Sequence, residues 1–176
     1  NIVKKTSLDY CPIISKNLNN KIFLKREDQQ IVKSFKIRGA HQYISSLSQS
    51  DLNKGIIAAS AGNHAQGVAL SANELNCSST IVMPVVTPSI KWKSVKNYGA
   101  EIILHGDTFD EAFKYALQKS EEDNLTFVHP FDHDDIIAGQ GTIGLEIINQ
   151  FDFRNNKLDA IFIPVGGGGL ISGIGY

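Results

Sequence analysis

Short apolar segments alternate with helical segments along this chain, and this alternation restricts the fold more than any other feature. The apolar segments of strand type lie at residues 21–26, 55–60, 80–83, 101–104, 126–128 and 160–165. Segments with apolar residues at helical spacing lie between them, at 35–48, 63–75, 88–97, from 108 onward and at 135–150. Strands that alternate with helices of about ten to fifteen residues predict a largely parallel sheet with helices on both faces. We therefore expect an α/β fold.

The composition is that of a globular protein and excludes several kinds of partner. Of the 176 residues, 42% are apolar and 20% are charged, and the formal net charge is -1. This charge provides no basic surface for nucleic acid, and no apolar run approaches membrane-spanning length, so we expect neither partner. Cys11 and Cys77 fit no metal or redox spacing, which favours reduced thiols and a cytoplasmic location. The sequence starts without a methionine and stops inside an expected helix, so we expect a piece of a longer protein.

Two histidines have the spacing of metal ligands but not the expected structural context. His129 and His133 are four residues apart, as two ligands on one helical face would be. Pro130 lies between them and would interrupt the helix that such a pair requires. The aspartates that follow stand at an expected helix start, where carboxylates complement the helix dipole. We therefore predict no metal site.

The segment Ser34–Ala40 places one lysine, Lys36, on the first turn of an expected helix. Ile37, Ala40 and Ile44 follow at helical spacing, and Lys36 borders this apolar stripe. An ammonium near apolar surface is partly desolvated, which favours the neutral amine, a nucleophile able to form a Schiff base. A lone lysine in such a place usually lays its stem on the core and keeps its charge in water. Neighbouring segments decide between these two interpretations.

The segment Ser-Ala-Gly-Asn-His-Ala-Gln-Gly at residues 60–67 lies between an expected strand and an expected helix. In open parallel sheets, ligands gather at the carboxyl ends of strands. Small residues around Gly62 let a ligand approach the backbone, and the free N–H groups of a helix that begins at Asn63 suit an anion. The alternative is an ordinary N-cap, in which Asn63 or Ser60 satisfies the helix start.

A run of four glycines follows the last expected strand, before Leu170; it consists of Gly166, Gly167, Gly168 and Gly169. Each glycine costs about 0.5–1 kcal/mol relative to alanine in regular structure, so a plain turn does not explain four. Successive N–H groups that wrap closely around a phosphate would explain them. The spacing matches neither the dinucleotide fingerprint nor a Walker loop.

Together, the three segments predict pyridoxal 5'-phosphate and an amino acid substrate as the ligands. This pair requires a lysine for the aldehyde, a site for the phosphate and a site for the substrate carboxylate. Phe35, next to Lys36, offers an apolar face for the pyridine ring.

The sequence closely resembles the threonine/serine dehydratases, which are pyridoxal-phosphate enzymes of the tryptophan synthase β fold group. The resemblance covers nearly the whole chain. It rests on Ser-Phe-Lys-Ile-Arg-Gly-Ala, on Ser-Ala-Gly-Asn-His-Ala-Gln-Gly, on Ala-Gly-Gln-Gly-Thr at 138–142 and on the glycine run, in this order. It implies the architecture of the fold type II enzymes, in which a small domain is inserted in a larger one. Residues 35–133 would form the small domain, and 1–34 with 134–176 part of the large domain, truncated at the C-terminus.

The resemblance also implies roles for single residues. Lys36 would bind the cofactor as a Schiff base and remove the α-proton of the substrate, and Phe35 would stack on the cofactor ring. Asn63 would hydrogen-bond the phenolic oxygen of the cofactor. Ser60, Gly62 and His64 would surround the substrate carboxylate. The glycine run and the Leu170 amide would bind the cofactor phosphate.

The implied reaction is the β-elimination of L-threonine, and also of L-serine, to 2-oxobutyrate or pyruvate plus ammonia. Serine racemases of the same group carry a second serine where this chain has Ala61, which cannot transfer a proton, so we expect elimination over racemisation. A serine racemase-like enzyme and a phosphate-ligand binding fragment without catalysis remain the alternatives. We expect a cytoplasmic threonine ammonia-lyase of isoleucine biosynthesis, assembled as a homo-oligomer, either a dimer or a tetramer.

Overall fold

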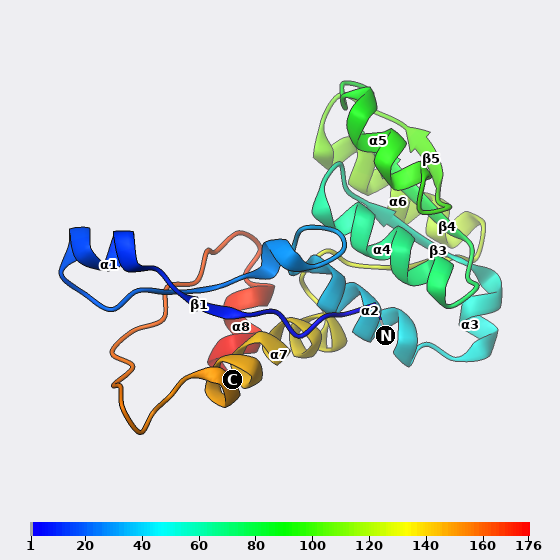
Figure 1. Ribbon diagram of the computed structural model, residues 1–176. Helices are drawn as coiled ribbons and strands as arrows, with labels where there is room; N and C mark the ends of the chain where they lie inside the picture. The colour runs from blue at the N-terminus through cyan, green and yellow to red at the C-terminus, as the bar shows by residue number, and fades with distance from the viewer. Residues whose placement is uncertain (1) are drawn as a thin grey trace.

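A four-stranded parallel sheet and its helices form one end of the molecule, at the upper right of Figure 1. The structure is a computed structural model that describes residues 2–176. The strand order is β5-β4-β3-β6, and the strands are β3 (Ile56–Ala59), β4 (Ser79–Met83), β5 (Glu101–Leu104) and β6 (Thr126–Phe127). Three helices connect them in chain order, α4 (Asn63–Glu74), α5 (Ser89–Lys96) and α6 (Phe109–Glu122). The predicted α/β fold with a parallel sheet is confirmed.

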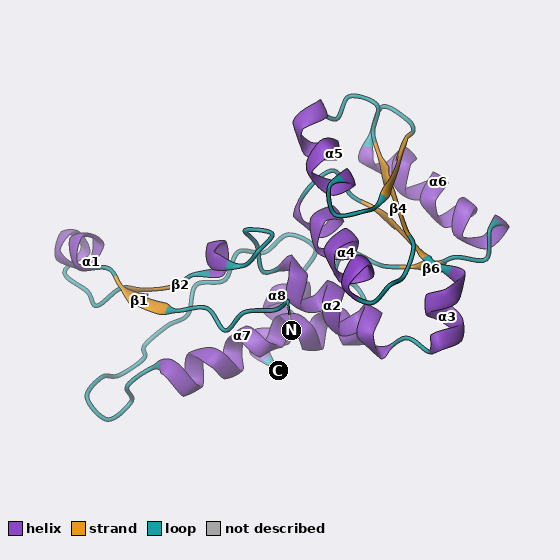
Figure 2. Cartoon of the chain, turned by 45° about the vertical axis from the view of Figure 1, so that its right-hand side comes forward, coloured by secondary structure: helices purple, strands orange, loops and turns teal. Residues whose placement is uncertain are grey.

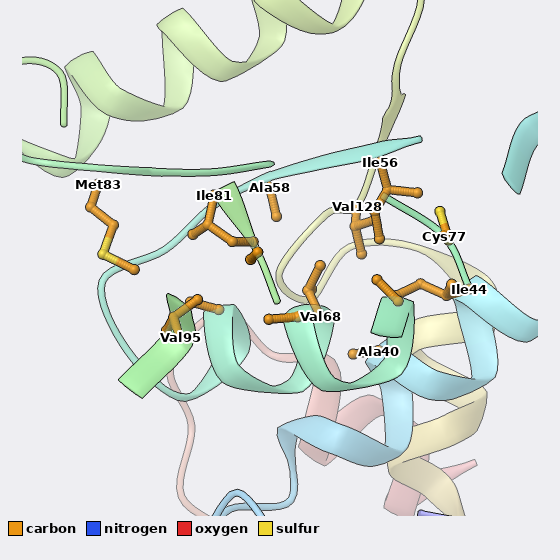
Figure 3. Packing of buried hydrophobic residues seen from close by; sticks show 14 of the residues in the cluster. Ala40, Ile44, Ile56, Ala58, Val68, Cys77, Ile81, Met83, Val95 and Val128 are labelled. Carbon is orange, nitrogen blue, oxygen red and sulfur yellow. The ribbon is translucent and has the colours of Figure 1, made fainter. Parts of the chain in front are cut away.

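β3, one of the two inner strands of this sheet, is apolar throughout because helices cover both faces of the sheet. Ile56 and Ala58 of β3 belong to a buried cluster with α4 and α5, whereas Ile57 and Ala59 belong to a cluster with α6. This division follows from the two-residue side-chain period of a strand. Figure 2 shows α4 and α5 on one side of the sheet and α6 on the other. In the close view of Figure 3, Ala58 points toward Val68 of α4.

The rest of the described chain forms a second group of elements. β1 (Leu8–Tyr10) pairs antiparallel with β2 (Phe23–Lys25), and α1 (Pro12–Leu18) lies between them in the sequence. The 3-10 turn η1 (Glu27–Gln29) leads to α2 (Lys36–Ser46) and α3 (Gln49–Lys54). Near the end of the chain, α7 (Asp134–Gln150) packs against both α2 and α8 (Gly169–Gly175).

Glycines let α2, α7 and α8 approach one another at backbone distance. A Cβ atom on Gly139 of α7 would lie 2.6 Å from the Cα atom of Gly39 in α2. A Cβ atom on Gly141 would lie 2.5 Å from the carbonyl oxygen of Gly173 in α8, so both positions exclude a side chain. Two residues turn a helix by about 200°, which places Gly139 and Gly141 on opposite faces of α7. The thickness of one helix backbone therefore sets the separation of α2 and α8.

A buried ion-pair network also joins α2 to α7 and to the N-terminal segment. The side chain of Arg38 is 2% exposed and donates hydrogen bonds to Glu27 and Glu146, each at 2.7 Å. Lys25 pairs with Glu146 as well, and Arg38 donates to the carbonyl oxygen of Lys4. Burial opposes the charge of Glu146, but hydrogen bonds from Arg38 and Lys25 outweigh it and lower the pKa of this carboxyl. The network therefore holds α2 in place with charges that are fully paired.

Two predicted strands differ from the structure. Residues 160–165 are not a strand, because none of the strands in residues 2–176 pairs with them and a strand needs a hydrogen-bonded neighbour. Phe162 in this segment is 93% exposed. Residues 21–26 do contain β2, but it pairs antiparallel with β1 and lies outside the parallel sheet.

The predicted helices are found with small shifts at their ends. Thr108 and Glu111 form the predicted capping box at the start of α6, with Thr108 accepting from the Glu111 N–H. The helix predicted at 35–48 is shorter, Lys36–Ser46, and α1 and α3 were not predicted. Across residues 2–176, no helix combines the length and the apolar character that crossing a membrane requires.

Candidate active site

A small cavity lies where the N-terminus of α2 meets the glycine run that precedes α8. Its volume is about 110 Å³. Every predicted cofactor-binding residue except Asn63 lines it; the lining residues are Phe35, Lys36, Pro130, Phe131, Gln140, Pro164, Gly166, Gly167, Gly168, Gly169 and Leu170. A larger groove of about 430 Å³ runs beside it along β2, α7 and residues 158–164, and most of its lining is apolar. The small cavity contains the groups that can carry chemistry.

Lys36 is the first residue of α2 and points toward the loop after β6. Ser34 Oγ accepts a hydrogen bond from the Lys36 N–H at 3.3 Å, which stabilises this helix start. The Lys36 Nζ atom donates to the carbonyl oxygen of Pro130 at 2.7 Å and lies 5.6 Å from the centre of the Phe35 ring. Burial lowers the pKa of Lys36 below its usual value, because desolvation disfavours the ammonium form. The amine is therefore more nucleophilic than a surface lysine.

The loop that holds the Pro130 carbonyl is itself fixed by His129. The Nδ1 atom of His129 accepts hydrogen bonds from the N–H groups of Asp132, at 2.7 Å, and of Phe131, at 3.3 Å. Burial lowers the pKa of His129, which agrees with a neutral ring that accepts at this atom. His133 caps α7 by accepting from the Asp135 N–H at 3.2 Å. The two histidines thus shape the cavity wall and the helix start.

The shape of the glycine run depends partly on Phe131. A Cβ atom on Gly167 would overlap the Phe131 ring, and one on Gly169 would lie 2.7 Å from the Phe131 carbonyl oxygen. Gly168 has a φ of 91°, a left-handed conformation that favours glycine. A Cβ atom on Gly166 would meet nothing within 4 Å. Packing against Phe131 accounts for Gly167 and Gly169, and the left-handed backbone accounts for Gly168. Only Gly166 still needs a close approach to an oxyanion as its explanation.

The backbone of the same run nevertheless presents unpaired donors. Within residues 2–176, the N–H groups of residues 166–170 have no protein acceptor. Successive free N–H groups in a glycine-rich turn form a concave site for an anion. The cavity thus joins a desolvated amine, Lys36, to a row of anion-binding donors.

The asparagine loop lies at the carboxyl end of β3, outside the lining of this cavity. Gly62, not Asn63, is the N-cap of α4, and no side chain caps the helix. Ser60 Oγ accepts from the Gly62 N–H at 3.2 Å, while Asn63 is exposed and its side chain has no partner in residues 2–176. A Cβ atom on Gly67 would lie 3.3 Å from the backbone of Ile37, so the first turns of α4 and α2 pack together. The ordinary N-cap alternative for Asn63 and Ser60 is therefore wrong.

His64, the remaining predicted substrate residue, is buried beneath this loop. It is 3% exposed, and its Nε2 atom lies 3.2 Å from the carbonyl oxygen of Val128. Burial, assisted by the charge of Lys36, lowers the pKa of His64 from 6.5 to about 3. The ring is thus neutral at physiological pH and ties α4 to the end of β6.

Stability is expected to fall with acidification because of His64. The folded pKa of about 3 lies below the ordinary 6.5, so the unfolded state takes up a proton first as the pH falls. The contribution of His64 is complete above pH 6.5 and is lost toward pH 3, at about 1.4 kcal/mol per pH unit. Urea unfolding of wild type and His64→Gln measures this, because glutamine keeps a donor for Val128 without titrating. The wild type should lose stability faster below pH 6.5; parallel curves would contradict the prediction.

Four cavity residues were not among the predicted site residues, namely Pro130, Phe131, Gln140 and Pro164. Signals for them existed, since Pro130 and Phe131 follow a predicted strand and Gln140 lies in the Ala-Gly-Gln-Gly-Thr motif. The role of Phe131 as a packing surface for the glycine run becomes visible only in three dimensions.

The geometry agrees with a known family of enzymes. The family model for the pyridoxal-phosphate dependent enzymes matches residues 1–176, and the chain belongs to this family. Among its relatives is threonine dehydratase 1 of Solanum lycopersicum, described as biosynthetic and chloroplastic, with 54% identity over 173 residues. The match covers 98% of this chain but only 28% of that protein.

Solved structures support the same assignment. The processed form of threonine deaminase isoform 2 from Solanum lycopersicum has a TM-score of 0.94 and 49% identity, over 98% of this chain and 47% of that one. Serine racemase from Dictyostelium discoideum has a TM-score of 0.87 and 35% identity, over 97% and 54% of the two chains. The resemblance to the threonine/serine dehydratases is thereby confirmed, and the fold of the racemases is closely similar.

Proposed function

We propose that the protein carrying this chain catalyses the pyridoxal-phosphate-dependent β-elimination of L-threonine, and also of L-serine, to 2-oxobutyrate or pyruvate and ammonia. The observation that carries the proposal is that the half-buried Lys36 and the free N–H groups of residues 166–170 line the same cavity. The 54% identity to a threonine dehydratase supports the choice of reaction and substrate.

The residues present fit this cofactor. Its aldehyde requires an amine of lowered pKa, which Lys36 provides, and its phosphate requires the unpaired donors of residues 166–170. Phe35 lines the same cavity and would offer its ring to the pyridine face. When bound, pyridoxal 5'-phosphate supplies an electron sink that acidifies the α-proton of an amino acid.

The chain contributes a base and a carboxylate site. We propose that the Lys36 amine, whose pKa is lowered by burial, accepts the α-proton of the substrate. Asn63 has a free side chain and would hydrogen-bond the phenolic oxygen of the cofactor. Ser60 and Gly62 would bind the substrate carboxylate, with His64 taking part through its backbone N–H because its ring is buried. Loss of water and hydrolysis of the resulting enamine then give the 2-oxo acid and ammonia.

The direct test is the release of 2-oxobutyrate from L-threonine and of pyruvate from L-serine. The chain spans 28% of the tomato relative, so the assay is run on both the 176-residue chain and the natural polypeptide in its full length. We expect activity in the full-length polypeptide with added cofactor. An absence of activity there would refute the proposal. An inactive 176-residue chain beside an active full-length polypeptide would mean that this segment alone does not catalyse the reaction.

Racemisation is the second candidate because a serine racemase has the same fold at 35% identity. Racemisation needs a proton donor on the opposite ring face, and the methyl side chain of Ala61 cannot be one. We predict that the wild type forms no D-serine from L-serine, and that Ala61→Ser forms measurable D-serine because it adds a hydroxyl. Chiral chromatography of the amino acid pool checks this. D-serine from the wild type would favour the racemase.

Other features follow from the same proposal. We propose the division into a small domain, residues 35–133, and part of a large domain, residues 1–34 and 134–176; the parallel sheet, which spans 56–127, supports it. A biosynthetic role that leads to isoleucine is consistent with the word biosynthetic in the name of the tomato relative. That relative is chloroplastic, so the proposed cytoplasmic location requires direct localisation. A homo-oligomer, dimer or tetramer, is proposed and would be checked by light scattering.

A further inference from the structure

Gln140 is a buried polar residue at the cavity that has no part in the function proposed above. It lies on α7 in the glycine-rich segment that contacts α2, and it is 2% exposed. Its side chain nevertheless lines the cavity, together with Lys36 and the glycine run. A glutamine with so little exposure must satisfy its amide groups inside the protein or on a ligand.

One end of the Gln140 amide is fixed by the helix that carries Lys36. The Oε1 atom accepts a hydrogen bond from the N–H of Gly39 at 3.2 Å. Gly39 lies three residues after Lys36, in the first turn of α2, where N–H groups lack partners within the helix. A Cβ atom on Gly39 would lie 2.4 Å from the Nε2 atom of Gln140, so a glycine at this position is what lets the side chain of Gln140 approach. The orientation of the amide is therefore set by α2.

The other end of the amide is free. Because Oε1 accepts from Gly39, the Nε2 group is the donor that remains, and it has no acceptor in residues 2–176. The donors around the cavity are this amide, the Lys36 amine and the N–H groups of residues 166–170. The one carbonyl that faces the amine, that of Pro130, is already occupied by it. No carboxylate side chain is among the lining residues. Such a donor-rich wall suits an anionic group with several acceptor atoms.

We propose that Gln140 is a binding residue for the phosphate of the ligand, to which its Nε2 group donates while its Oε1 atom holds the first turn of α2. The proposal rests on the proposed function, because it takes the ligand to be pyridoxal 5'-phosphate. Gln140 thereby adds a side-chain donor to the backbone donors of the glycine run. Because Gln140 also holds the first turn of α2, which carries Lys36, a phosphate bound to its Nε2 group would help to fix the position of Lys36.

The test compares two probes, pyridoxal 5'-phosphate and pyridoxal, which differ only in the phosphate. Their dissociation constants are measured by absorbance titration of the full-length polypeptide, as wild type, Gln140→Glu and Gln140→Leu. In Gln140→Glu, one carboxylate oxygen can still accept from the Gly39 N–H, but the other oxygen replaces the Nε2 donor. Gln140→Leu removes both the acceptor and the donor. The exposed Gln118 on α6 provides the matched control, Gln118→Glu.

We expect both variants to bind pyridoxal 5'-phosphate about tenfold or more weakly, the range for a lost hydrogen bond to a charged group. The affinity of Gln140→Glu for pyridoxal should stay within about twofold of the wild type, since pyridoxal has no phosphate and glutamate keeps the acceptor for the Gly39 N–H. Gln140→Leu also releases the first turn of α2, so it should weaken the binding of pyridoxal as well. In Gln140→Glu, an equal loss for both probes, or no loss for either probe, would overturn the role of Gln140 and leave the proposed function intact. A wild type that binds neither probe would overturn the proposed function and this inference with it.

Discussion

Replacing Lys36 with alanine is expected to abolish both turnover and the visible absorbance of covalently bound cofactor. Lys36 is the only lysine among the residues that line the small cavity, and burial lowers the pKa of its amine. Removing a general base alone slows a reaction by about 10² to 10⁴, and Lys36 would also be the covalent attachment point. The rate of 2-oxobutyrate release should therefore fall about 10³-fold or more.

The matched control for this experiment is Lys114→Ala. Lys114 is exposed on α6, on the side of the sheet away from α2, and has no ion-pair partner in residues 2–176. Its replacement should leave the absorbance spectrum and the rate unchanged. A Lys36→Ala variant that keeps the absorbance band and the rate of the wild type would show that another amine carries the cofactor.

Replacing Arg38 with alanine should have the largest effect on stability. The Arg38 side chain is 2% exposed and pairs with Glu27 and Glu146, whose side chains are 14% and 16% exposed. Its removal leaves two largely buried carboxylates without their main partner, and breaking a buried ion pair in this way costs about 3–5 kcal/mol. Urea unfolding followed by circular dichroism measures the free energy of unfolding.

Arg26→Ala is the control, because this arginine pairs with Asp9 and Asp28 at the surface. Its side chain is 38% exposed, and exposed ion pairs contribute little to stability. We expect an unfolding midpoint close to that of the wild type. If Arg38→Ala also unfolds close to the wild type, the network around Glu146 does not stabilise the fold.

The parallel sheet was predictable from the sequence because its signals are local. β3, β4, β5 and β6 each lie within or overlap a predicted apolar segment, and each is followed by a helix with an apolar face. A strand buried on both faces has a continuous apolar sequence, as the fully buried β3 does. The sequence signal for the start of α6 was also local, since Thr108 and Glu111 form the capping box within four residues.

β1 and its antiparallel pairing with β2 were missed because the stability of this pair depends on distant residues. β1 is three residues long, and β2 alongside it gains support from Phe151, whose ring centre lies 5.4 Å from that of Phe23. No periodic pattern can be recognised in three residues. At residues 160–165 a strand was predicted that the structure does not contain. The segment has the apolar composition of a strand, but a strand also needs a neighbouring strand to pair with, and composition does not provide one.

Most of the predicted cofactor-binding residues line one cavity in the structure, but the residues that shape this cavity were not predicted as site residues. Lys36 and the glycine run were found because a lysine beside an apolar stripe and four glycines are unusual as sequences. Phe131 and Gln140 lie in segments that the sequence pointed to, but they were not predicted as site residues because their importance lies in contacts across the fold, with Gly167 and with Gly39. Only the structure revealed that packing, and not ligand binding alone, accounts for most of the glycines.

The ion pairs of Arg38 also impose an order on events while the protein is being synthesised. Glu146 follows Arg38 by 108 residues, so the ribosome has added the complete parallel sheet, residues 56–127, before the second carboxylate exists. Until then α2 has no α7 to pack against, and Lys36 lacks its place beside the glycine run. The nascent chain can therefore complete the sheet first, while placement of Lys36 waits until residues 134–176 have been translated.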